Sequence, residues 1–593
     1  MPETTPAPSR AQFPVARNRH GGHHGAMRVA FFIFLLFLSS AIPFAGAAPE
    51  AKAVGPHGLP VISGMENIKT GKWGPLVPEY SLEVTAAGPS PADLTNRGLY
   101  QLQLFRSPQA ARHFLTALRE DDSCPMAWVG LYLALLERGD EAKEVREKCY
   151  RSANLLRIRT NPREQMWVDA LAALHLRGVR AFAESLEAIR KAHPDDRNAQ
   201  VWLPLMLRDG HDLAGEPHLG QKAARALLAI HLEKYPEDPV VLHAWCQLAL
   251  VGPSPDEALG QARLLLALSP PSAYFRQVAG MVFYRSGDAA AAAAALDDAR
   301  RFEEKSLAEE GISPVAAPTY FDNLDMLAMA LVEAGRKEDA LALARAARQI
   351  DLPSGLPPSS ATREFGFFSL SAEARVHARA SEWRQAIHSL PPIDHPILAS
   401  SPFFARSMEC LRLYIEGQLA LESGQSASAK EVLKKLETSF AQLGELVEQS
   451  KKAGMEPQFA EVFRLADFLQ YDLRAGEKFL SGDRTMAAVW WRRATGRQIS
   501  GASRAIPRWP RGAAESMAAT FGRAGDFPTA VRAWEQAVRE RPQSGWALRG
   551  LQNARSKTGD RAGTEAAAVA LSSVWAAADE ALRQEEGEEK NKN

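Results

Sequence analysis

The chain has 593 residues, of which 46% are hydrophobic and 24% are charged. This balance is typical of folded proteins and excludes a largely disordered chain. Its 70 lysines and arginines are matched by 70 aspartates and glutamates, so the net charge is zero. Proteins that bind nucleic acid through phosphates usually carry a positive excess, so we expect no nucleic-acid partner.

The N-terminus has the features of a secretory signal peptide, which we assign to residues 1–48. Arg28 precedes an apolar run from Val29 to Leu38, and small residues follow up to Ala45-Gly46-Ala47. The run of about ten residues is too short to span a bilayer, and A-x-A is a cleavage signature. We therefore expect a periplasmic or secreted protein, with Met27 as a second candidate start. A membrane anchor formed by the uncleaved segment is the alternative.

The first repeat follows a linker or extended arm, which the proline- and glycine-rich residues 49–92 predict. Gly98, Ala110, Phe114 and Ala117 occupy the small, small, large and small positions of a roughly 34-residue helix-turn-helix unit. The small residues should let the two helices approach each other. Phe114 should fill the space between this unit and the next.

Later segments repeat this pattern in phase, with alanines in the second helix and a glycine where the first helix ends. These glycines are Gly139, Gly287, Gly335, Gly424, Gly482 and Gly525. A glycine at such a turn can adopt the left-handed conformation that closes a helix. The sequence thus predicts an all-α, tetratricopeptide (TPR)-like helix-turn-helix solenoid, wound as a right-handed superhelix.

The repeat pattern predicts two arrays, over residues 92–350 and 403–582. Between them, residues 351–402 contain several helix-breaking prolines and predict an irregular connection, within which Ser371 to Ser389 keep a helical pattern. The segment is either an irregular unit or a hinge between the arrays. The polar residues 583–593 predict a disordered tail.

Several phrases of the sequence resemble a bacterial family of exported TPR proteins whose function is largely uncharacterised. Leu99 to Leu135 is similar to the opening repeats of that family, and Arg163-Glu164 to the start of its next helix. Gly545 to Leu551 and Trp575 to Asp579 are similar to its closing repeats. The resemblance implies an exported repeat protein, but it implies no particular activity.

The same family usually carries a histidine pair one helical turn apart, followed by a His-Asn pair in the next repeat. Here the corresponding positions hold Gln277 and Met281, and then Asp322-Asn323, of which only Asn323 matches. The resemblance therefore transfers no metal site to this chain.

We predict no catalytic, cofactor-binding or metal-binding residues, and no cofactor. His211 and His218 flank a polar loop that also contains Asp212 and Glu216. We predict no zinc site there, because zinc ligands usually lie on rigid elements. His243 lies on an apolar helix and predicts a core histidine. The acidic pairs Glu303-Glu304 and Glu309-Glu310 predict a solvated helix face.

The four cysteines, Cys124, Cys149, Cys246 and Cys410, lack metal-site spacing, so we expect buried free thiols.

A stacked helical array presents a concave surface that suits a peptide or a partner helix. We therefore interpret the chain as an interaction scaffold in the cell envelope with a protein or peptide partner, and not as an enzyme. The alternative is a metal- or small-ligand-dependent binder or enzyme that uses the central groove, by analogy with histidine-bearing relatives. Contact with a membrane is expected only through an uncleaved N-terminal anchor.

Overall fold

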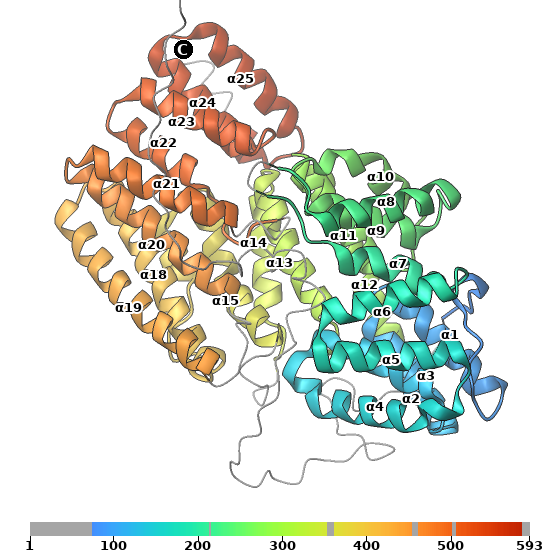
Figure 1. Ribbon diagram of the computed structural model, residues 1–593. Coiled ribbons are helices and arrows are strands. Elements are labelled where there is room, and N and C mark those ends of the chain that lie inside the picture. Colours follow the sequence, from blue (N-terminus) through green and yellow to red (C-terminus); the bar gives the residue numbers. More distant parts are fainter. Residues whose placement is uncertain (1–73, 213–214, 353–360, 453–459, 501–505, 584–593) are drawn as a thin grey trace, which may run out of the picture.

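The computed structural model describes residues 74–212, 215–352, 361–452, 460–500 and 506–583 (Figure 1). The predicted signal peptide, the first part of the predicted linker and nearly all of the predicted tail lie outside these residues. Within them the protein is helical and contains no named strand, only an isolated bridge between His211 and Pro217. No helix in this part of the chain is both long and apolar enough to cross a membrane.

The helices form consecutive pairs, in which each first helix packs on its partner and, except in the third pair, on the first helix of the next pair. Six pairs make up the first half: α1 (Pro89–Gln103) with α2 (Ser107–Glu120), α3 (Pro125–Ala134) with α4 (Lys143–Leu156), α5 (Pro162–Arg177) with α6 (Val179–Ala192), α7 (Arg197–Leu207) with α8 (Leu219–Lys234), α9 (Pro239–Leu250) with α10 (Leu259–Ala267), and α11 (Ala273–Arg285) with α12 (Ala289–Glu310).

Six more pairs follow: α13 (Pro318–Glu333) with α14 (Lys337–Arg348), α15 (Ala361–Arg379) with α16 (Trp383–Ser389), α18 (Pro402–Glu422) with α19 (Ser426–Lys452), α20 (Ala460–Leu480) with α21 (Arg484–Ser500), α22 (Ala513–Arg523) with α23 (Phe527–Glu540), and α24 (Gly545–Thr558) with α25 (Arg561–Val574). The single turn α17 (Pro396–Ala399) lies between two pairs. Short 3₁₀ segments occur at Pro78–Tyr80, Leu136–Ala142, Arg157–Arg159, Pro255–Ala258 and Pro314–Ala316. This pairing confirms the predicted all-α, TPR-like solenoid.

The small residues predicted at the helix crossings do allow close packing. Phe114 of α2 is fully buried, and a Cβ atom on Gly98 of α1 would lie 2.6 Å from its ring. A Cβ atom on Gly130 of α3 would lie 2.2 Å from the same ring. The phenyl ring is therefore held between two glycines of successive pairs. The predicted turn glycines all have positive φ, from 52° at Gly139 to 93° at Gly482.

Residues 361–389 form a regular helix pair inside the predicted irregular connection, where the sequence had predicted a helical segment only over Ser371 to Ser389. This pair, α15 and α16, packs between α13–α14 and α18 as the other pairs do. Only residues 353–360 of the preceding stretch lie outside the described structure. The division of the chain into two arrays remains a prediction.

The solenoid winds tightly enough for one turn of the superhelix to touch the next. The first pair meets the sixth, where Arg106, between α1 and α2, donates to Glu310 at the end of α12 over 2.8 Å. The seventh pair meets the twelfth, where Nε1 of Trp546 donates to the carbonyl of Val332 over 2.8 Å. We call these contact zones the first seam and the second seam.

The interior contains polar groups as well as apolar ones. All four cysteines are buried and free, as expected. Two acidic residues that we predicted on a solvated helix face are covered instead. Glu303 is buried, and Glu310 is largely covered where it pairs with Arg106 and Arg112. The prediction was wrong because this face of α12 packs against helices that lie about 200 residues earlier in the chain.

Candidate functional site

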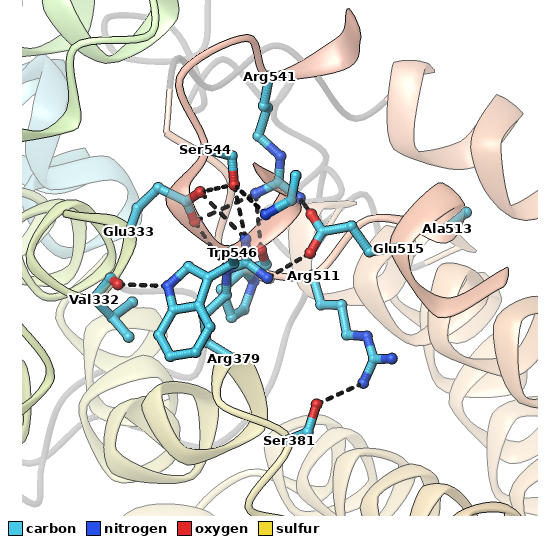
Figure 2. Close-up of polar contacts among 12 residues, drawn as sticks. Val332, Glu333, Arg379, Ser381, Arg511, Ala513, Glu515, Arg541, Ser544 and Trp546 are labelled. Atoms are coloured by element: carbon cyan, nitrogen blue, oxygen red, sulfur yellow. Dashed lines mark hydrogen bonds and ion pairs between the residues drawn. The ribbon is translucent and has the colours of Figure 1, made fainter. Parts of the chain in front are cut away.

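A buried network of charged side chains joins the two turns of the superhelix at the second seam (Figure 2). Arg379 of α15 donates to Glu333 of α13 over 2.8 Å and to Glu515 of α22 over 2.5 Å. Arg541, just after α23, also pairs with Glu515, and the hydroxyl of Ser544 donates to Glu333. Two carboxylates and two guanidiniums thus balance one another in this interior.

The charges of this network hold each other in the ionised state. Burial favours the neutral form of Glu333, but the guanidiniums of Arg379 and Arg541 outweigh it and hold the pKa of this carboxyl below its usual range. The pKa of Arg541 is raised because Glu515 and Glu333 outweigh the effect of its burial. The network therefore stays ionised and paired at neutral pH.

One face of this network forms the wall of a cavity of about 260 Å³. The cavity lies between the α11–α12 turn, α20, the end of α21, residues 507–512 and the α23–α24 turn. We call it the arginine cavity, after six lining residues: Arg285, Arg464, Arg497, Arg508, Arg511 and Arg541. The carboxylates among its described lining residues are Glu333 and Glu540.

Three of the six arginines have a carboxylate partner close by. Arg541 pairs with Glu515, Arg497 lies 2.6 Å from Asp467, and Arg508 lies 3.0 Å from a carboxylate oxygen of Asp325. These pairs neutralise part of the positive charge that lines the cavity.

Two other arginines form no ion pair within the described part of the chain. Arg285 donates only to the backbone carbonyls of Leu250 and Gly252. Burial therefore lowers the pKa of its guanidinium with no carboxylate to offset the effect. Arg511 donates to the hydroxyl of Ser381 and stacks on Trp383, and its charge also acts on the buried carboxyl of Asp472. The arginine cavity thus keeps a positive charge that an anionic group could balance.

The rest of the cavity wall is largely apolar. Trp509 and Phe468 are buried, and Leu465 and Pro507 lie beside them. Nε1 of Trp509 has no hydrogen-bond acceptor among the described residues. Burial raises the pKa of Tyr284 to about 12, so its phenol is neutral. Guanidiniums, a neutral phenol and apolar side chains suit the binding of an anion that is attached to an apolar group.

The histidines considered in the sequence do not come together. Nδ1 of His211 lies 3.2 Å from the carbonyl of Val251, and His218 caps α8 with its backbone. No group of three or more metal-ligating side chains occurs in the part of the chain that the structure describes. His243 is fully buried and stacks on Phe275 at 4.2 Å, and burial lowers the pKa of its imidazole well below the usual value.

The positions that hold histidines in the resembling family are core positions here. Gln277 and Met281 of α11 are buried. Asn323 of α13 is buried as well, and its amide donates to the carbonyl of Leu296 over 2.9 Å. The arginine cavity lies elsewhere and was not predicted, because its residues are far apart in the sequence and share no motif.

Neither a protein-family model nor a curated protein matches the chain. Among solved structures, it is similar to "Human IFIT1 dimer with m7Gppp-AAAA", with 15% identity, a TM-score of 0.31, and coverage of 84% of this chain and 97% of that one. It is also similar to "Crystal structure of APC/C hetero-tetramer Cut9-Hcn1", with 10% identity, a TM-score of 0.25, and coverage of 82% and 87%. At these TM-scores the fold assignment rests on the helix pairing within the chain itself.

Proposed function

We propose that the protein is a repeat scaffold that binds an acidic segment of a partner polypeptide in the arginine cavity. The observation that carries this proposal is the pair of guanidiniums, Arg285 and Arg511, beside an apolar wall. Neither forms a close ion pair with a carboxylate among the described residues, and Arg285 has no carboxylate neighbour that offsets its burial. Arginine pairs well with carboxylates, often through two parallel hydrogen bonds. A segment that alternates acidic and apolar side chains would satisfy both parts of the cavity.

We further propose that the scaffold works outside the cytoplasm, in the cell envelope or beyond it. The support is the charged residue, the short apolar core and the A-x-A motif within residues 1–48. N-terminal sequencing of the protein recovered from cell fractions tests this part of the proposal. A mature chain that begins near Ala48 is expected, and an intact N-terminus in the cytoplasmic fraction would contradict it.

The binding proposal is tested by affinity capture with the wild-type chain and with the Arg285→Gln/Arg511→Gln variant. Arg151 and Arg180 are highly exposed arginines of α4 and α6, so Arg151→Gln/Arg180→Gln makes the same charge change away from the cavity. A partner should be retained by the control variant and lost by the cavity variant. Labelled acidic peptides from that partner should then bind in a fluorescence-anisotropy titration, more weakly as salt is added. Equal capture by both variants would show that the cavity is not the binding site.

A further inference from the structure

The first seam contains a second cavity, which has a volume of about 320 Å³. It lies between the end of α1, the start of α2 and the C-terminal turns of α12. We call it the polar pocket. The side chains that matter for its chemistry are Gln101, Arg106, Gln109, Arg112 and Glu310.

Two of these side chains are buried and lack hydrogen-bond partners at several atoms. Gln109 is 1% exposed, and neither its amide oxygen nor its amide nitrogen has a partner within the described residues. Arg112 is 2% exposed, and its Nε and Nη1 atoms are likewise without an acceptor in this part of the chain. Nε2 of Gln101 and Nε of Arg106 also have no acceptor among the described residues.

Unpaired buried polar atoms are uncommon in folded proteins, and each one costs free energy. Here several of them line one cavity rather than being scattered through the core. A ligand bound in the cavity would supply the missing hydrogen-bond partners of such a cluster. The cluster is therefore the observation on which we base a binding-site proposal.

The ligand class follows from the charges and from the hydrogen-bonding atoms. Arg106 and Arg112 both pair with Glu310, so the three side chains leave one positive charge. The unpaired atoms are mostly donors, because guanidinium nitrogens only donate, while the Gln109 amide can both donate and accept. A single carboxylate would use the charge and the donors. A hydroxyl or carboxamide on the same molecule would pair with Gln109.

We propose that the polar pocket binds a small free carboxylate that also carries a hydroxyl or a carboxamide group. This site is independent of the arginine cavity, because it lies at the other seam and shares no lining residue with that cavity; α12 reaches both, but with opposite ends. The two proposals can therefore fail separately.

The test is isothermal titration of the full-length protein with glycolate, L-lactate and succinamate. Acetate lacks the second polar group and succinamide lacks the charge, so these two serve as matched control ligands. At least one of the three probes should bind with a dissociation constant below about 1 mM. It should bind about ten-fold more tightly than acetate or succinamide. No binding by any of the three, or equal binding of the control ligands, would overturn the proposal.

The variant Gln109→Leu locates the binding and also reports on the fold. It replaces an unpaired buried amide by an apolar group of similar shape, so the melting temperature should stay the same or rise. Probe affinity should fall about ten-fold, whereas Arg285→Gln in the other cavity should leave it unchanged. A lower melting temperature for Gln109→Leu would show that this amide is already paired. Unchanged probe affinity would place the ligand elsewhere. Either result would overturn the proposal.

Discussion

Replacing Glu137 by glutamine should make the protein more stable at alkaline pH. Glu137 lies in the 3₁₀ segment after α3 and is 8% exposed. Burial raises the pKa of its carboxyl to about 7 from a reference of 4.5, although the hydroxyl of Ser107 donates to it over 2.8 Å. Nearby Glu303, whose pKa burial also raises to about 7, adds to the effect.

The sign and the size of the effect follow from linkage. Between pH 4.5 and 7 the folded protein holds the Glu137 proton while the unfolded chain has released it. The free energy of unfolding therefore falls as the pH rises through this window. A shift from 4.5 to about 7 corresponds to about 3–4 kcal/mol at about 1.4 kcal/mol per pKa unit. Most of this loss occurs between pH 5 and pH 8.

The assay is urea unfolding of the wild-type chain and of Glu137→Gln at pH 5 and pH 8. Glutamine has no carboxyl to ionise, so the variant should lose about 2–3 kcal/mol less than the wild type between the two conditions. Glu184 of α6 is exposed, so Glu184→Gln should keep the wild-type pH dependence. If Glu137→Gln and the wild type changed in parallel, the carboxyl would titrate normally in the folded protein, and the reasoning would fail.

Two further predictions concern the second seam. Glu515→Gln leaves the buried guanidiniums of Arg379 and Arg541 with one carboxylate between them. The free energy of unfolding, measured by urea titration, should therefore fall by about 3–5 kcal/mol. A loss below about 1 kcal/mol would show that the network behaves like an exposed ion pair. Gly335→Ala places a Cβ atom 2.6 Å from the Cβ of Ala578, at a residue whose φ is 78°, so α24 and α25 should become sensitive to limited proteolysis. Gly424 also has a positive φ but no neighbour within 4 Å of an added Cβ, so Gly424→Ala should not have this effect.

The sequence could predict the local rules of this fold because those rules recur at fixed spacing. Gly98, Phe114 and the turn glycines each follow from contacts within one pair or between adjacent pairs. Gly130 holds the other face of Phe114 but was not singled out, because a glycine inside a helix gives no sign of which ring approaches it.

Contacts between superhelical turns were beyond sequence reasoning. Glu303 and Glu310 have the sequence pattern of an exposed helix face, and only the winding of the solenoid brings the first pair against them. Likewise, Arg285 and Arg511 line one cavity because the turn of the sixth pair at Gly287 packs against Gln543, between the eleventh and twelfth pairs. No local pattern records how many pairs complete one turn, so neither cavity could be located in advance.

The second seam also changes how this chain can come apart. An open repeat array is coupled mainly between neighbours, so it can lose its terminal repeats one after another and can extend under load. Here the N–H of Asp579 donates to the carbonyl of Gly335, and Trp575 contacts Glu333, which lies 242 residues earlier. Loss of the last pair therefore also exposes the middle of the chain. Such distant contacts raise the contact order, so folding is expected to be slow for a helical protein and unfolding to involve the two ends of this loop together.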